Sequence, residues 1–165
     1  MGSILALLEA SRRRRSIAAE AFRATLGGLT GVHVQVEPIN ADAEGDGLLR
    51  ADIQTHVESV LREAGMRVHT QSGLFADVPG TPVLHVDVMT VRLDGRYAYT
   101  VRLELWQGVT LTRAPGRTAL ALTWSAPQLV GTVAAESLPE LHKTVRSAVE
   151  GFVEECRLAT ADHAR

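Results

Sequence analysis

Two pairs of polar side chains between residues 82 and 106 have the types and spacing that could support chemistry. His85 and Asp87 stand two positions apart, and so do Arg102 and Glu104. In an extended strand this spacing places both members of a pair on the same face. An imidazole beside carboxylates could exchange protons with a substrate or contribute ligands to a metal ion. Whether the four groups converge depends on how the strands that carry them pair.

The turn between these strands predicts that pairing. Asp94-Gly95 lies between two alternating runs and is typical of a two-residue β-hairpin turn. A two-residue loop sets Asp87 opposite Arg102 and His85 opposite Glu104. On the other face it sets apolar residues opposite each other, namely Val88 with Val101, Val86 with Leu103 and Leu84 with Leu105. Since every polar group then has a cross-strand partner, we favour a structural role and predict no catalytic, metal-binding or cofactor-binding residue.

A second turn extends this hairpin to a three-stranded meander over residues 82–125. Pro115-Gly116 occupies the two central positions expected of a type II turn. An even-length loop there predicts Val109 opposite Leu122 and Leu111 opposite Leu120 on the apolar face, together with Trp124.

The other face of the meander is predicted to be small and polar apart from Trp106. It would carry Thr100, Arg102, Glu104, Trp106, Thr110, Thr112, Ala119, Ala121, Thr123 and Ser125. Such a face can simply be solvated. The sharper hypothesis is a docking surface anchored by Trp106, because aromatic residues are enriched at interface hot spots. The predicted partner-binding residues are Thr100, Arg102, Trp106, Thr110 and Thr123.

A run of four arginines, Arg12, Arg13, Arg14 and Arg15, interrupts a predicted N-terminal helix at residues 3–26. It could contact a partner, anionic lipid or nucleic acid. The favoured alternative is a solvated helical turn, because no aromatic residues are interleaved with the arginines. The formal net charge of −2 gives no reason to expect nucleic-acid binding. Contact of these arginines with a membrane surface is therefore less favoured than a solvated helical turn.

Two further features have residue types that occur in functional sites. The acidic segment at residues 40–45 begins like a calcium loop, but Ala51 stands where the bidentate Glu belongs, so we favour an acidic loop before a helix capped by Asp46 or a neighbour. Cys156, the single cysteine, falls on the apolar stripe of a predicted helix and is interpreted as a small core residue. Common catalytic motifs such as GxSxG, HExxH and the P-loop are absent from the sequence.

Periodicity predicts the remaining elements. We expect strands at residues 32–36 and 66–70, helices at 48–64 and 138–159, a loop at 71–81 and an irregular connection at 127–135. The predicted fold is α+β, with a mainly antiparallel five-stranded sheet and both helices packed on one face. Residues 1–27 would form a helical extension, 28–159 a single domain and 160–165 a tail. Hydrophobic residues at 45% and charged residues at 22% are ordinary for a globular chain.

The sequence contains little that indicates a compartment. A lone cysteine excludes an intramolecular disulfide, and no apolar run reaches the roughly 20 residues of a membrane-spanning helix. The N-terminal apolar stretch precedes the arginines, which is the reverse of an export signal, so a cytoplasmic location is the default expectation.

At residues 31–38, 46–66 and 82–105 the chain resembles small exported bacterial proteins. In its order of elements it is also similar to the lipopolysaccharide-assembly lipoprotein family and to the N-terminal domain of the TolB family. The resemblance implies a periplasmic location, and it transfers no catalytic residue.

Two functions are consistent with these patterns. The leading hypothesis is a non-enzymatic binding or assembly module that docks a protein partner, or another copy of itself, through the sheet or the N-terminal helix. The alternative is a small-ligand carrier or a small-molecule enzyme, in which residues 71–81 form a lid over a pocket.

Overall fold

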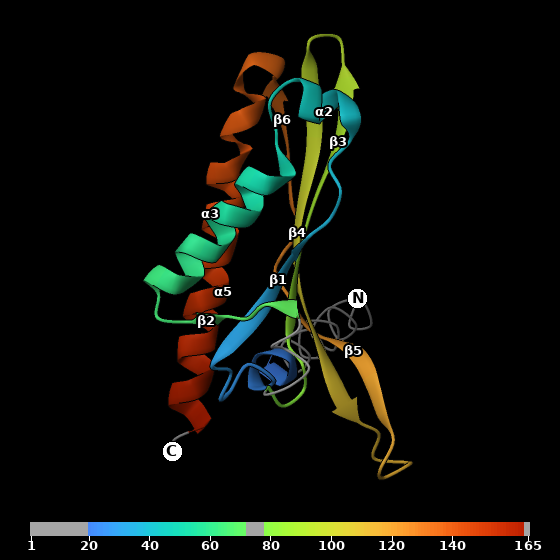
Figure 1. Ribbon diagram of the computed structural model, residues 1–165, viewed down its shortest axis with the longest axis vertical. Coiled ribbons are helices and arrows are strands. Elements are labelled where there is room, and N and C mark those ends of the chain that lie inside the picture. The colour runs from blue at the N-terminus through green and yellow to red at the C-terminus, as the bar shows by residue number, and fades with distance from the viewer. Residues whose placement is uncertain (1–19, 72–77, 164–165) are drawn as a thin grey trace, which may run out of the picture.

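The structure is a computed structural model that describes residues 20–71 and 78–163. A short helical segment at residues 20–24 comes first, and the chain then forms an α+β domain built on one sheet (Figure 1). The elements that follow are β1 (Gly31–Val36), α2 (Ala41–Gly45), α3 (Arg50–Glu63), β2 (Arg67–Val68), β3 (Val83–Leu93), β4 (Arg96–Thr110), β5 (Thr118–Ser125), β6 (Leu129–Ala134), the 3₁₀ helix η1 (Ala135–Glu140) and α5 (Leu141–His163).

The sheet is mixed and has six strands, which corrects the predicted five-stranded, mainly antiparallel sheet. The strand order is β2-β1-β3-β4-β5, and β6 also pairs with β4. β1 runs parallel to β2 and β3, whereas β3–β4, β4–β5 and β4–β6 are antiparallel. The parallel pairs arise because the chain returns to the sheet through α3 after β1, a crossover that strand periodicity alone does not reveal.

The sixth strand lies where the sequence predicted an irregular connection. β5 and β6 pair with successive halves of the long strand β4, and residues 126–128 join them. Gly131 occupies an inward position of β6, and the ring of Tyr99 lies over it. Only glycine fits there, because an added Cβ would come within 2.6 Å of the Tyr99 hydroxyl. A glycine at that position removes the apolar alternation by which a strand is recognised.

The predicted register of the first hairpin is confirmed. Asp87 pairs with Arg102 and His85 with Glu104, and all three predicted apolar pairs are present on the opposite face. Asp94 and Gly95 have φ values of 34° and 76°, the positive values that a type I′ turn needs at both central residues.

The predicted register of the second hairpin is wrong. β4 and β5 are joined by a loop over residues 111–117, and a bulge at Leu105/Trp106 shifts the pairing. Leu122 therefore pairs with Trp106 and Leu120 with Gly108, which places both leucines on the face of Trp106 instead of the core face. Trp124 does lie in the core, as predicted, and is 5% exposed.

The core lies between the sheet and the two long helices. α3 and α5 lie side by side over the same face of the sheet (Figure 1). The apolar stripe predicted for the last helix is confirmed, with Leu141, Val145, Val149, Phe152 and Cys156 all buried. The α-helix begins at Leu141, after η1, rather than at the predicted residue 138, and it continues to His163, beyond the predicted end at 159.

The acidic segment is also helical. Residues 41–45 form α2, and α3 begins after Leu49 without a side-chain cap, so the predicted capping role of Asp46 is wrong. The Asp46 carboxylate instead accepts a hydrogen bond of 2.8 Å from the buried Tyr97 hydroxyl and lies 3.3 Å from Arg92.

Candidate functional site

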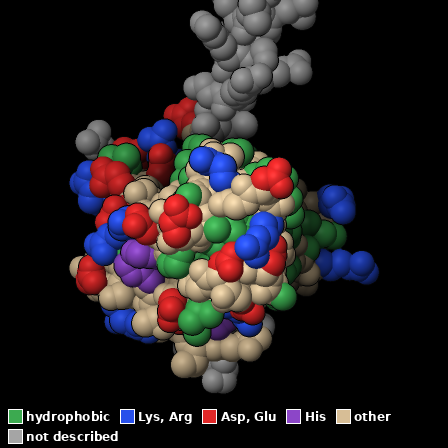
Figure 2. All heavy atoms as spheres, turned by 90° about the horizontal axis from the view of Figure 1, so that it is seen from above, with side chains coloured by type: hydrophobic (Ala, Val, Ile, Leu, Met, Phe, Trp, Pro, Cys, Tyr) green, Lys and Arg blue, Asp and Glu red, His purple; other side chains and the backbone are tan. Residues whose placement is uncertain are grey.

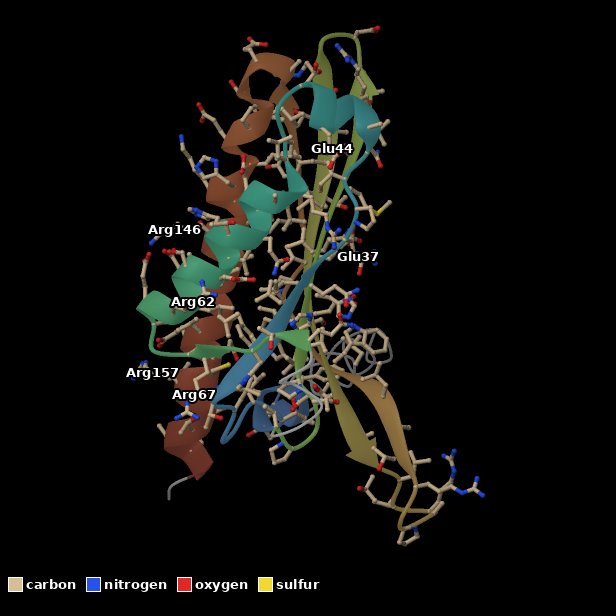
Figure 3. All side chains as sticks on the ribbon, in the orientation of Figure 1. Glu37, Glu44, Arg62, Arg67, Arg146 and Arg157 are labelled. Atoms are coloured by element: carbon tan, nitrogen blue, oxygen red, sulfur yellow. The ribbon has the colours of Figure 1, made fainter. Side chains whose placement is uncertain are left out.

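The strongest candidate site is a hollow on the face of the sheet that points away from α3 and α5, here called the outer face. The hollow has a volume of about 580 Å³. Figure 3 shows Glu37 beside the strands, on the opposite side from Arg62 of α3 and Arg146 of α5. The hollow is lined by Glu37, His85, Asp87, Met89, Arg102, Glu104, Trp106 and Leu120.

The confirmed hairpin register positions most of these side chains. Residues 85, 87 and 89 of β3 share a face with residues 102, 104 and 106 of β4 because side chains alternate along each strand. Glu37 joins them because it directly follows β1, which runs parallel to β3. Leu120 joins them from β5 through the bulge. The predicted residues Arg102 and Trp106 therefore do lie together on one face.

An ion pair crosses the floor of the hollow. The Arg102 guanidinium donates two hydrogen bonds to the same Asp87 oxygen, one of them from Nε at 3.2 Å. The hydrogen bonding to Asp87, followed by the charge of that carboxylate, raises the pKa of Arg102. Arg102 therefore stays protonated and is not suited to exchange protons with a substrate.

His85 has a different hydrogen-bond partner from the one that the hairpin suggested. Its Nδ1 lies 3.0 Å from the Glu37 carboxylate, whereas Glu104 accepts a hydrogen bond of 3.1 Å from the indole of Trp106. The His85 and Trp106 rings are 6.1 Å apart. The sequence could not indicate Glu37, because its approach to His85 depends on the parallel β1–β3 pairing.

The predicted threonines occupy three different environments. Thr110 is exposed near the end of β4, and Thr100 is half-buried opposite Met89 and Val130. Thr123 is not on the outer face, because it is the extra residue of the bulge. It is 8% exposed, and its hydroxyl accepts a hydrogen bond of 2.8 Å from Gln107. The structure therefore places Thr123 deeper than the predicted outer-face position, and its contact with a partner stays a prediction.

Arg12, Arg13, Arg14 and Arg15 lie outside the described residues, as do residues 72–77 of the predicted lid. Two described cations, Arg113 and Arg117, lie in the loop between β4 and β5, shortly before Leu120 of the hollow. Both are exposed, and neither forms an ion pair with any residue in the described ranges. This loop lies at the end of the hairpin that leans away from the helices (Figure 1).

A second, apolar cavity lies on the helical side of the sheet. It has a volume of about 620 Å³ and is open to solvent. One wall is α5, at Ala148, Gly151 and Phe152, and the opposite wall includes Trp124 and Leu129. Arg23 lies at its edge with Nε 3.4 Å from the Glu155 carboxylate. Residues 78–81, the described end of the predicted lid, do not line this cavity.

Two histidines also meet between α3 and the start of α5. His56 and His142 pack edge to face with their rings 5.2 Å apart. Along residues 20–71 and 78–163, no three His, Cys, Asp or Glu side chains are close enough to hold a metal ion. None of the helices in the described part of the chain is long and apolar enough to cross a membrane. Seen from above, acidic, basic and hydrophobic side chains are mixed over the surface (Figure 2).

No protein-family model matches the sequence, and no curated protein matches it either. The functional inference therefore depends on the geometry of the two cavities and of the outer face.

Proposed function

We propose that this protein is a non-enzymatic binding or assembly module that docks a protein on the outer face of its sheet. The observation that carries the proposal is a set of large apolar side chains exposed on that face. Their exposed fractions run from 38% at Leu122 to 73% at Val130. The set comprises Met89, Val91, Leu93, Leu120, Leu122 and Val130.

Strand alternation shows why this exposure is unusual. On an antiparallel sheet with one solvated face, outward positions are normally polar. Here the outward residues of β3 change from His85 and Asp87 to three apolar side chains towards the strand's end. Leu120 and Leu122 extend the apolar surface to the other side of Trp106. Contiguous apolar surface rimmed by polar groups marks protein interaction sites.

The hollow adds a polar feature that supports orientation of a partner. Its three carboxylates, Glu37, Asp87 and Glu104, outnumber its one arginine, so a partner with basic side chains would be favoured. Trp106 lies at the junction of this acidic hollow and the apolar wall. Its indole can bury apolar area while its N–H remains bonded to Glu104.

The first experiment compares partner capture by the full chain and by variants of the outer face. Trp106→Ala and the double variant Leu120→Asp with Leu122→Asp should lose binding to proteins that the wild-type chain retains. The matched control is Leu49→Asp with Leu158→Asp, two exposed leucines at the start of α3 and on α5. Each variant is first checked for native circular dichroism. Capture that is equal for wild type and outer-face variants would refute the proposal.

A second candidate function is the carriage of an apolar ligand in the cavity beside α5. Its volume of about 620 Å³ lies within the range of roughly 300–1,000 Å³ that is usual for ligand pockets. Gly151 faces open space, so a side chain placed there would fill the cavity without a clash at Cβ. Gly151→Leu should therefore abolish binding of an apolar fluorescent probe such as anilinonaphthalene sulfonate. Equal probe binding by wild type and Gly151→Leu would exclude this function.

A further inference from the structure

The occupant of the outer face can be inferred from the charges at its two ends. We propose, resting on the docking function above, that the partner is a second copy of this chain. In this arrangement the loop at residues 111–117 of one protomer lies against the acidic hollow of the other. The pairing is two-fold symmetric, so that each protomer contributes one loop and one hollow.

The two ends of the face are complementary in charge. The hollow holds Glu37, Asp87 and Glu104 around a single guanidinium, that of Arg102. The loop holds Arg113 and Arg117, which are exposed and form no ion pair within the described ranges. Within one protomer, the two ends are separated by about 25 Å, from the rise of roughly 3.4 Å per residue along β4. The loop and the hollow of one protomer therefore cannot neutralise each other.

The surface between the two ends suits a symmetric contact. Its centre is Gly108, which has no side chain and pairs with Leu120. A two-fold axis that lies between the two outer faces and runs across β4 near this glycine would set Gly108 and Leu120 of each copy against the same two residues of the other. In isologous pairing the same patch meets itself in reverse order. Leu120 and Leu122, which lie between the loop and the hollow, satisfy that requirement, because the positive loop of each copy then meets the negative hollow of the other.

The shape of the sheet is consistent with this arrangement. The lower ends of β4 and β5 lean away from the side that α3 and α5 cover (Figure 1). The outer face therefore lies on the inner side of the bend. Two copies with such a bent hairpin can pack with their outer faces together, which brings each loop towards the partner's hollow.

Sedimentation equilibrium of the purified full chain, whose monomer mass is 17.8 kDa, tests the proposal directly. The wild type should associate to a dimer. Arg113→Glu with Arg117→Glu should raise the dimer dissociation constant at least tenfold, because carboxylates then face carboxylates. Glu37→Lys with Glu104→Lys should also raise the dissociation constant at least tenfold, because lysines then face the arginines of the loop. The control is Arg67→Glu with Lys143→Glu, at two exposed residues remote from the face. It changes the net charge by as much as the loop variant does and should leave the dimer intact.

The decisive measurement mixes the two charge-reversed variants. Each alone should be weakened, yet their equimolar mixture should form a heterodimer of near wild-type affinity, because both loop–hollow contacts regain opposite charges. If the lysine variant loses its native circular dichroism, Glu37→Gln with Glu104→Gln replaces it in the single-variant comparison. That variant should weaken the dimer, and an unchanged dissociation constant would overturn the proposal.

The results also separate this proposal from the docking function on which it rests. A wild-type chain that stays monomeric at every concentration overturns self-association, whereas the outer-face capture experiment then still decides whether a different protein docks there. A dimer that neither charge reversal weakens, or a mixture that shows no heterodimer, assigns the dimer contact to another surface and overturns the proposal.

Discussion

Tyr97 shows how a single buried polar group fixes the end of the sheet to the segment before α3. Its side chain is fully buried, and its hydroxyl donates to Asp46. Arg92 lies over the ring at 5.7 Å and completes the group by pairing with Asp46. Burial, followed by the hydrogen bond to Asp46, raises the pKa of Tyr97 above its ordinary value of 10.0.

This shift predicts the direction of the response to alkali. Because the folded state holds the Tyr97 proton more tightly than the unfolded state, the resulting stability is present below pH 10 and is lost as pH rises through the folded pKa. Wild-type stability should therefore fall above pH 10 more steeply than that of Tyr97→Phe, as measured by urea unfolding at several pH values. Parallel slopes for wild type and Tyr97→Phe would contradict the assignment.

Cys156 is the one thiol of the chain, and its surroundings make it unreactive. It is 5% exposed, and burial, aided by the charge of Glu155, raises its pKa from 9.0 to about 12. Since the thiolate is the reactive form, the native thiol should react with a disulfide reagent at pH 8 far more slowly than the unfolded chain. The measurement is the rate of absorbance change with and without urea. Similar rates in the two states would show that the thiol is accessible.

At the level of elements, α3 stabilises the sheet by more than its apolar face. Beyond the short strand β2, the outer edge of β1 has no strand neighbour among the described residues. The side chain of Gln54 on α3 takes the place of a neighbouring strand along this edge. Its amide accepts a hydrogen bond from the Val36 N–H at 3.3 Å and donates one to the Val34 carbonyl at 3.1 Å. Arg50 Nε then donates to the Val36 carbonyl at 2.7 Å. Side chains of the helix thus cover a strand edge that would otherwise be open to pairing.

Gln54→Ala should therefore destabilise the domain by about 1–3 kcal/mol, because it leaves part-buried backbone groups of β1 unpaired. Alanine is the better helix former, so a loss of stability cannot come from helix propensity. Ser59→Ala on the same helix removes only an exposed hydrogen bond to Glu63 and should change stability by less than about 0.5 kcal/mol. The free energy of unfolding in urea checks both. An unchanged value for Gln54→Ala would exclude the edge-covering role.

The two hairpins show which parts of such a fold a sequence can predict. Asp94-Gly95 specifies a loop length, and the alternation on both sides confirms the same register, so the pairing of β3 with β4 follows from local residues. The bulge at Leu105/Trp106 has no local residue signal. Thr123 is held there by distant groups, since its carbonyl accepts a hydrogen bond from the Thr25 hydroxyl and its own hydroxyl donates to the Leu105 carbonyl. The outward position of Leu120 and Leu122 follows from those tertiary contacts, so the apolar part of the candidate site could not be predicted.

At the scale of the whole molecule, the two faces of the sheet differ in whether helices cover their apolar residues. On the inner face, α3 and α5 cover the apolar side chains, and the pattern predicts this correctly. On the outer face, no helix of the described chain covers Met89, Val91, Leu120 or Val130. Since exposed apolar area costs free energy in water, covering this face with a second molecule would stabilise the assembly.

The loop–hollow contacts proposed for the dimer predict how the assembly responds to salt. Salt screens the exposed charges at these contacts but leaves burial of Leu120 and Leu122 largely unaffected. Raising sodium chloride from 50 to 500 mM should increase the dimer dissociation constant on the order of tenfold, because several exposed pairs of about 0.2–1 kcal/mol each are weakened together. Arg113→Glu with Arg117→Glu should show the opposite trend, since salt then screens a repulsion between carboxylates. The same salt response for both proteins would place the charges outside the contact.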